Sequence, residues 1–219
     1  MRDIIVSQLL VSSPAPPNTP WADIINSEEI DTLAGPKGAK FNNDLLLERS
    51  SQSEIKPAAI LVLLIKRIGE FTILFTKRPE EMSVHAGQVS FPGGKIESCD
   101  HSPSDTALRE AEEEVGLPRE KVEVICRLKN HLIATGYRIT PVVGIIESPV
   151  KFVCNPSEVA ELFEMPLNYA LDRENYRIQE MPSRGIRKKS YVIEYSNYVI
   201  WGATAAVLVN LRDIIRAAN

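Results

Sequence analysis

The chain has 219 residues, 44% of them hydrophobic, and a formal net charge of −4 at pH 7. One substantial core with a small extension fits this length, whereas two full domains do not. The negative charge argues against broad nonspecific binding of nucleic acid, which requires a positive field.

The cysteines and the apolar runs indicate the compartment in which the protein is expected. The three cysteines, Cys99, Cys126 and Cys154, lack CxxC spacing, so neither a disulfide framework nor a zinc site is expected. The short apolar stretch at the N-terminus is interrupted by polar residues and has no convincing cleavage site, which argues against a signal peptide. The longest apolar run, 58–65, is far shorter than the roughly 20 residues that span a bilayer. We therefore expect a cytoplasmic protein without a membrane span.

Residues 1–35 are predicted to form an N-terminal extension, followed by the main domain at 36–219. Prolines at 14–20 are typical of a stiff connector, and the acidic segment 27–33 is a candidate short helix.

The main domain opens with β-rich segments. Runs at 58–66 and 71–77, joined by 67–70, predict a hairpin. A shorter strand-like run at 88–91 leads into Gly93-Gly94, where paired glycines predict a sharp turn and allow the main chain to approach a ligand closely.

A helix is predicted between Ser102 and Gly116. Ser102 is a suitable N-cap, Pro103 suits the first turn, and Asp105 is the acid of a capping box. Gly116 supplies a left-handed C-cap. Spacings of three and four residues form one apolar stripe, made by Leu108, Ala111 and Val115.

The second half of the chain continues with both kinds of element. The patterns predict strands at 122–128, 140–146, 189–194 and 197–201, and helices at 156–163 and 203–217. Interleaved strands and helices favour an α/β fold with a mixed sheet between helices.

Three acids of the first helix in this domain form the candidate site. At about 100° per residue, Glu110, Glu113 and Glu114 fall within an arc of roughly 100° beside the apolar stripe, on a side expected to face solvent. Like charges at these spacings repel, and a hard divalent cation such as Mg²⁺ or Mn²⁺ would reverse that repulsion. The alternative is a solvated acidic face.

Joined to the preceding glycines, this helix resembles the Nudix box, Gly-x5-Glu-x7-Arg-Glu-U-x-Glu-Glu-x-Gly-U, where U is apolar. The matching residues are Gly94, Arg109-Glu110, Ala111, Glu113-Glu114 and Gly116-Leu117. Asp100 stands where the family has its first Glu, and eight residues instead of seven separate it from Arg109. Asp100 is therefore given no metal role.

The resemblance implies a Nudix-type α/β/α sandwich and a site for Mg²⁺ or Mn²⁺. In that arrangement Glu110 and Glu114 are the main metal ligands, Gly94 lies at the metal, and Glu113 is a further ligand or the base that orients water. Arg109 organises the box carboxylates, although an ordinary surface salt bridge would also explain it. An acid outside the box, Glu174 or Glu180, is an alternative base.

Residues 74–94 also resemble the additional motif of coenzyme A diphosphatases within this superfamily. That resemblance implies cleavage of coenzyme A, or a derivative, into 3′,5′-ADP and 4′-phosphopantetheine or its acyl form. Arg78 is the candidate phosphate contact, and His85 and Gly93 are further candidates for substrate binding. The chain departs from the motif at Phe75, Pro79, Ser83 and Glu97.

Two other functions remain open at this point. The same metal helix could serve a Nudix hydrolase for another nucleoside diphosphate derivative, such as ADP-ribose. A noncatalytic nucleotide-sensing module of this family would usually have lost box acids. A small-molecule partner is expected in each case, and the resemblance also makes a homodimer plausible.

Overall fold

The computed structural model describes residues 2–12, 16–26, 55–81, 86–133, 136–147, 149–183 and 186–217. The predicted helix at 27–33 lies outside them. The described helices include none long and apolar enough to cross a membrane.

A mixed sheet organises the molecule. Its centre is the parallel pair of β1 (Lys56–Lys66) and β7 (Tyr137–Glu147), which are in register over their full lengths. The strand order is β3-β2-β1-β7-β5, with β2 at Phe71–Lys77, β3 at Val89–Ser90 and β5 at Glu123–Arg127. Three short strands attach to this path antiparallel: β4 (Gly93–Lys95) to β1, β6 (His131–Leu132) to β7, and β8 (Glu161–Pro166) to β2.

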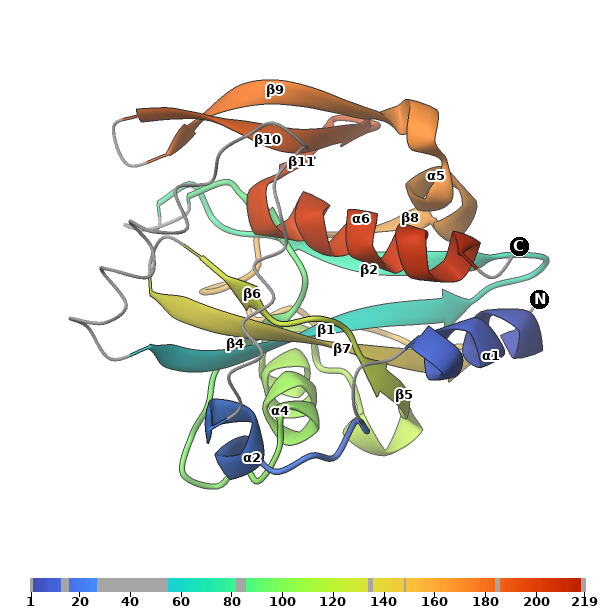
Figure 1. The fold of residues 1–219 in the computed structure, drawn as a ribbon, viewed down its shortest axis with the longest axis vertical. Coiled ribbons are helices and arrows are strands. Elements are labelled where there is room, and N and C mark those ends of the chain that lie inside the picture. Colours follow the sequence, from blue (N-terminus) through green and yellow to red (C-terminus); the bar gives the residue numbers. More distant parts are fainter. Residues whose placement is uncertain are drawn as a thin grey trace.

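Helices cover both faces of this sheet, so the expected α/β/α sandwich is confirmed. Figure 1 shows α4 (Pro103–Val115) and α2 (Trp21–Asn26) on one face, and α6 (Gly202–Arg216) with α1 (Arg2–Ser12) on the other. A second, antiparallel sheet of three strands lies beyond α6, made by β9 (Tyr176–Ser183), β10 (Ile186–Tyr195) and β11 (Tyr198–Trp201). Short helices connect the layers: η1 (Arg119–Lys121), α5 (Leu167–Leu171) and η2 (Arg173–Asn175).

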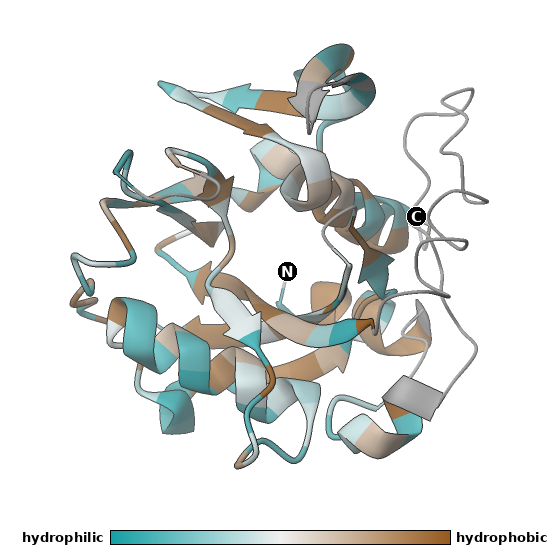
Figure 2. Cartoon of the chain, turned by 90° about the vertical axis from the view of Figure 1, so that its left-hand side faces the viewer, coloured by the Kyte–Doolittle hydropathy of each residue, from teal (hydrophilic) through white to brown (hydrophobic). Residues whose placement is uncertain are grey.

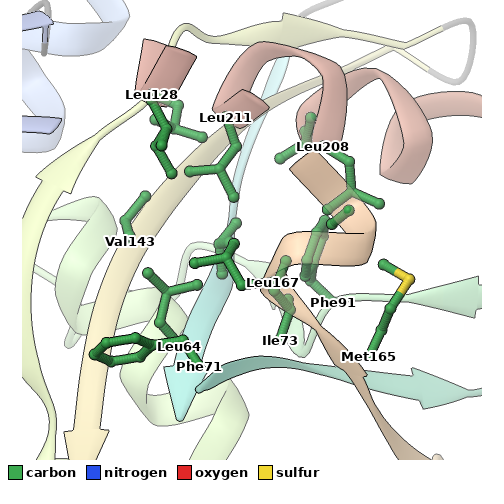
Figure 3. Packing of buried hydrophobic residues seen from close by; sticks show 14 of the residues in the cluster. Leu64, Phe71, Ile73, Phe91, Leu128, Val143, Met165, Leu167, Leu208 and Leu211 are labelled. Atoms are coloured by element: carbon green, nitrogen blue, oxygen red, sulfur yellow. The ribbon is translucent and has the colours of Figure 1, made fainter. Parts of the chain in front are cut away.

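The pleat of β1 divides the core in two. Val62 and Leu64 point into the cluster under α6, which Figure 3 shows, whereas Leu61 and Leu63 point into the cluster under α4. Since successive strand residues face opposite sides, a strand covered on both faces must be apolar throughout. This explains the unbroken apolar run of β1. Figure 2 accordingly shows hydrophobic colour along the inner strands and hydrophilic colour on the outer turns.

Several sequence predictions need correction. The helix expected at 156–163 is wrong: a turn precedes β8, which begins at Glu161 and pairs with β2. Pairing with an open strand edge outweighs local helix propensity here. The strand expected at 140–146 is longer, because β7 pairs with β1 from Tyr137 to Glu147. Pro141 lies within it, and its carbonyl accepts from the N–H of Leu128 at 2.9 Å. The helices α1, α2 and α5 and the strand β9 were not predicted.

The N-terminal helices pack on the sheet layers. Ile5 and Leu9 of α1 belong to the core under α6, and Trp21 and Ile24 of α2 belong to the core under α4. The domain boundary at residue 35 falls outside the described residues and stays a prediction.

Leu9 provides a direct test of this packing. Leu9 is fully buried while its neighbour Leu10 is 56% exposed. We expect Leu9→Ala to lower the free energy of unfolding by about 2–5 kcal/mol, because it removes buried methyl groups and leaves a cavity. Leu10→Ala is the matched control and should change little. Urea unfolding measures both, and equal effects of the two substitutions would contradict the packing of α1.

Candidate active site

The helix α4 begins and ends where the sequence predicts. Ser102 and Asp105 form a reciprocal capping box, with Ser102 N–H donating to Asp105 Oδ2 at 2.9 Å and Asp105 N–H donating to Ser102 Oγ at 3.3 Å. Gly116 ends the helix in the left-handed conformation, at φ 64°. Ala111 and Val115 are fully buried against the sheet. These contacts fix the rotation of the helix, and with it the direction in which its acids leave the backbone.

The paired glycines do not make the expected turn. They lie in the short strand β4, where Gly93 pairs with Ile60 and Gly94 with Ala59. A Cβ atom on Gly93 would stand 2.4 Å from the carbonyl oxygen of Ala59, and one on Gly94 would stand 2.4 Å from the carboxyl group of Glu110. Glycine is therefore needed at one position for strand pairing and at the other for the approach of an α4 carboxylate to the backbone.

Arg109 is the centre of the hydrogen-bond network. Its guanidinium uses five N–H donors: two bind Asp100 at 2.9 and 3.1 Å, one binds the Lys95 carbonyl at 2.9 Å, and two bind Glu110 and Glu113 at 3.1 and 3.0 Å. The side chain is only 8% exposed. A planar guanidinium with every donor engaged has one orientation, so Arg109 is held in place between Asp100 and two box acids, and its burial contradicts the surface salt-bridge alternative.

Asp100 has a structural role that the sequence prediction did not give it. Burial raises the pKa of Asp100, but hydrogen bonds from Arg109, the Glu97 N–H and the Thr106 hydroxyl outweigh burial, so the net shift is downward. The hydrogen bond with Asp100 raises the pKa of Arg109 above its ordinary value. The two groups therefore stay ionised as a bidentate pair.

Glu114 is buried, which corrects the expectation that it faces solvent. Its residue exposure is 5%. Burial, together with the charge of Glu110, raises the pKa of Glu114 to about 8, although the Gly93 N–H donates to this carboxyl group. One carboxyl oxygen, Oε2, has no hydrogen-bond partner among the described residues. A buried carboxyl oxygen without a donor calls for a proton or a cation.

The other two acids differ in their surroundings. Glu110 lies beside Gly94, and burial raises its pKa despite the charge of Arg109. The side chain of Glu113 is 54% exposed and turns toward Arg109. The expected convergence of three acids is wrong as the side chains stand, since no three acidic, His or Cys side chains of the described ranges meet closely enough to hold a metal. Glu110 is the acid between the other two: it shares Arg109 Nη1 with Glu113, and its charge raises the pKa of Glu114.

The donor set of this site suits a hard divalent cation. Glu110 and Glu114 offer carboxylate oxygens next to the β4 backbone, and Oε2 of Glu114 lacks a donor in the part of the chain that is described. Mg²⁺ and Mn²⁺ prefer oxygen ligands of this kind and keep several waters.

The other predicted site residues differ in whether they lie near the acids of α4. Arg78 is half-buried, and its charge lowers the pKa of Glu114, which places it at the site. His85 lies outside the described residues. Glu174 in η2 and Glu180 in β9 lie in the layer across the sheet from α4, so neither adjoins the box acids within this chain (Figure 1).

Sequence reasoning missed one acid, Glu158. Its negative charge raises the pKa of both Glu110 and Glu114. Asn155 holds it in place: the side-chain amide donates to Glu158 at 3.0 Å, and the Asn155 N–H donates to the Glu114 carbonyl at 2.8 Å. This residue falls within the helix predicted at 156–163, which gives it no role at the site.

Comparisons with known proteins show the family to which the chain belongs. The family model for the NUDIX domain matches residues 55–181. The protein named "Uncharacterized Nudix hydrolase NudL" from Yersinia pestis (strain Pestoides F) is 43% identical over 154 residues, 70% of this chain and 77% of the relative, and the protein of that name from Yersinia pseudotuberculosis serotype O:1b (strain IP 31758) matches equally. Among solved structures, the Nudix hydrolase RenU from M. smegmatis is 27% identical with a TM-score of 0.45, covering 52% of this chain and 72% of that one.

The two glycines of β4 should respond differently to alanine. Gly94→Ala meets the mobile end of the Glu110 side chain, so we expect stability to change little while the affinity for Mn²⁺ falls by about tenfold or more. Gly93→Ala meets the backbone of β1 and has a φ of 152°, so its midpoint of thermal unfolding should fall clearly. Calorimetric titration with Mn²⁺ and thermal unfolding measure the two effects. Undiminished Mn²⁺ affinity in a folded Gly94→Ala variant would contradict the placement of Glu110.

The pKa of Glu114 makes stability depend on pH in metal-free solution. The carboxyl group takes up its proton near pH 8 in the folded protein but near its ordinary value of 4.5 in the unfolded chain. Between these values the folded state binds the additional proton, so the free energy of unfolding falls as pH rises, at about 1 kcal/mol per pH unit. Urea unfolding in EDTA from pH 5 to 8 tests this. Glu114→Gln is the control, and its free energy of unfolding should lack the fall with pH that the Glu114 proton causes. Equal slopes of this free energy against pH in wild type and variant would contradict the raised pKa.

Proposed function

This chain belongs to the NUDIX domain family, and on that premise we propose that it is a metal-dependent coenzyme A diphosphatase. It is a hydrolase of phosphorus anhydrides, as the family match and the relatives named Nudix hydrolase show. The proposed reaction cleaves the pyrophosphate of coenzyme A, or of a derivative, into 3′,5′-ADP and 4′-phosphopantetheine or its acyl form. The observation that carries the metal-dependent chemistry is the buried, donor-free Oε2 of Glu114 beside Glu110 and β4.

Support for coenzyme A as the substrate comes from the segment that leads into the site. The residues that match the coenzyme A diphosphatase motif run from Leu74 and Thr76 in β2, through Arg78, to Gly93-Gly94 in β4. The two ends of this motif are thus parts of one sheet, and the β4 end lies next to the Glu110 carboxyl group of α4.

In this proposal Glu110 and Glu114 hold Mg²⁺ or Mn²⁺ beside Gly94. When bound, such an ion neutralises diphosphate charge and acidifies a coordinated water. Arg109 fixes Glu110 and Glu113 through its two Nη1 hydrogen bonds. Displacing the Glu114 proton becomes part of binding, because the pKa of this group is near 8.

Glu113 is the proposed general base. It is the most exposed of the three acids and is held by Arg109 at 3.0 Å, so its free oxygen can take the proton of an attacking water at the rim of the site. Glu158 is the alternative, since it lies close enough to raise the pKa of both buried acids.

Arg78 is the proposed phosphate ligand. Its Nε is buried and lacks a hydrogen-bond partner within the described ranges, and its charge acts on Glu114. A guanidinium binds phosphate oxygens through short, charge-assisted hydrogen bonds. Gly93 and His85 complete the proposed substrate contacts. A homodimer and a cytoplasmic location stay predictions of the sequence.

A substrate panel tests the proposal. Purified protein with Mg²⁺ or Mn²⁺ is offered coenzyme A, acetyl-coenzyme A, ADP-ribose and dinucleoside polyphosphates, with products identified by mass spectrometry. We expect the coenzyme A compounds to have the highest kcat/KM and to yield 3′,5′-ADP. The departures from the motif at Ser83 and Pro79 keep another substrate open. A higher kcat/KM for ADP-ribose than for coenzyme A would contradict coenzyme A as the substrate and favour another nucleoside diphosphate derivative.

Glu114→Gln tests the metal role. The substitution keeps the shape of the side chain but removes a carboxylate ligand, so we expect kcat to fall by about a hundredfold or more while circular dichroism stays unchanged. Glu112→Gln is the matched control on the same helix, where the carboxylate pairs with Arg119 at the surface. It should keep near-normal turnover. Near-normal turnover of Glu114→Gln would exclude Glu114 as a ligand.

A further inference from the structure

The segment 16–26, which precedes the family match at 55–181, is bound to the start of the catalytic helix. The Trp21 N–H donates to the His101 carbonyl at 3.0 Å, and the Ser104 hydroxyl donates to the Pro17 carbonyl at 2.7 Å. On its other side, Arg138 in β7 donates to the Ile24 carbonyl at 2.8 Å. These contacts hold the segment across the N-terminal turn of α4, where Figure 1 shows α2 beside that helix.

A buried series of hydrogen bonds leads from this segment to the site. The indole N–H of Trp21 donates to Thr106 Oγ1 at 3.1 Å, and the Thr106 hydroxyl donates to Asp100 Oδ2 at 2.9 Å. The same Asp100 oxygen accepts from Arg109 Nη2 at 2.9 Å. All four side chains are buried.

We propose that Trp21 is a positioning residue for hydrolysis, acting through Thr106 and Asp100 to fix the orientation of Arg109 toward Glu110 and Glu113. The inference rests on the proposed function, because it assigns Trp21 to the same site. It also gives the N-terminal segment a specific part in the reaction.

The Thr106 hydroxyl explains why an indole donor is needed. This hydroxyl has two acceptors within reach, Asp100 Oδ2 at 2.9 Å and the Ser102 carbonyl at 3.5 Å. An N–H that occupies a lone pair of the hydroxyl oxygen restricts its rotation and polarises its O–H toward Asp100. Without that donor, the hydroxyl can turn to the Ser102 carbonyl, as Ser and Thr side chains commonly do within a helix. Asp100 would then lose one of the donors that set its orientation.

A change in the orientation of Asp100 affects Glu110 and Glu113, because every N–H donor of Arg109 is engaged. Its Nε and Nη2 groups are held by Asp100 and the Lys95 carbonyl, and only Nη1 faces Glu110 and Glu113. A small rotation of Asp100 therefore turns the guanidinium plane and shifts both acids together.

Trp21→Phe tests the proposal while keeping an aromatic ring in the core. We expect kcat to fall by about three- to tenfold, the size of one lost buried hydrogen bond, with KM nearly unchanged. The same loss should appear with coenzyme A and with ADP-ribose, since Arg109 acts on the acids. Ser104→Ala is the matched control, because it removes a bond between α4 and the same segment that lies outside the series. It should lower the midpoint of thermal unfolding but keep kcat within about twofold of wild type.

A double-mutant cycle separates positioning from packing. Thr106→Val removes the hydroxyl, and we expect the combination with Trp21→Phe to be no slower than Thr106→Val alone, because both break one series. Additive losses would assign Trp21 to packing only. So would an unchanged kcat in Trp21→Phe with a lowered unfolding midpoint.

Nuclear magnetic resonance provides a readout that does not depend on turnover. The Nε–H resonance of Arg109 should shift in Trp21→Phe and in Thr106→Val but stay in place in Ser104→Ala. An unmoved resonance in Trp21→Phe would overturn the proposal whichever substrate is cleaved. Failure to cleave coenzyme A with normal cleavage of ADP-ribose would instead refute the proposed substrate and leave the role of Trp21 to these measurements.

Discussion

The bidentate pair of Arg109 and Asp100 is the interaction on which the site depends. Three acids crowd one flank of α4, and a helix alone gains nothing from bringing them together. The buried guanidinium compensates two of them and leaves Glu114 to the β4 backbone, where burial holds its pKa near 8. An isolated ion pair with this burial would gain little stability, but a fully hydrogen-bonded one fixes geometry. The orientation of Glu110 and Glu113 is therefore set by contacts within the protein.

Two parts of the fold bring this geometry about. The strand β4 sits on β1 with glycine at both critical positions, so the backbone lies against the Glu110 carboxyl group. The turn at Asn155 is bound to the last turn of α4 and holds Glu158 close enough to act on Glu110 and Glu114. Sheet, helix and turn thus all contribute to one acidic centre. Its charges act on one another: Glu158 raises the pKa of both Glu110 and Glu114, and Glu110 raises that of Glu114.

The sequence predicted what local rules determine. The caps and apolar stripe of α4 follow from residue type and spacing, and so does the hairpin of β1 and β2. Prediction from the sequence failed where contacts between distant segments determine the structure. The burial of Glu114 depends on how closely β4 and the Asn155 turn approach α4, and the role of Asp100 depends on a partner nine positions away on the helix. The strand β8 forms at a place of helical composition because β2 offers an open edge. Helical periodicity predicts the direction in which each acid leaves the axis of α4, but it does not predict which other segments bury that acid.

A crystal structure in Mn²⁺, located by its anomalous scattering, would test the central claim most directly. The account predicts one ion held by the carboxylates of Glu110 and Glu114 beside Gly94, with Arg109 still bidentate on Asp100. An ion bound elsewhere, or an Arg109 that has left Asp100 to reach the acids in another orientation, would contradict it.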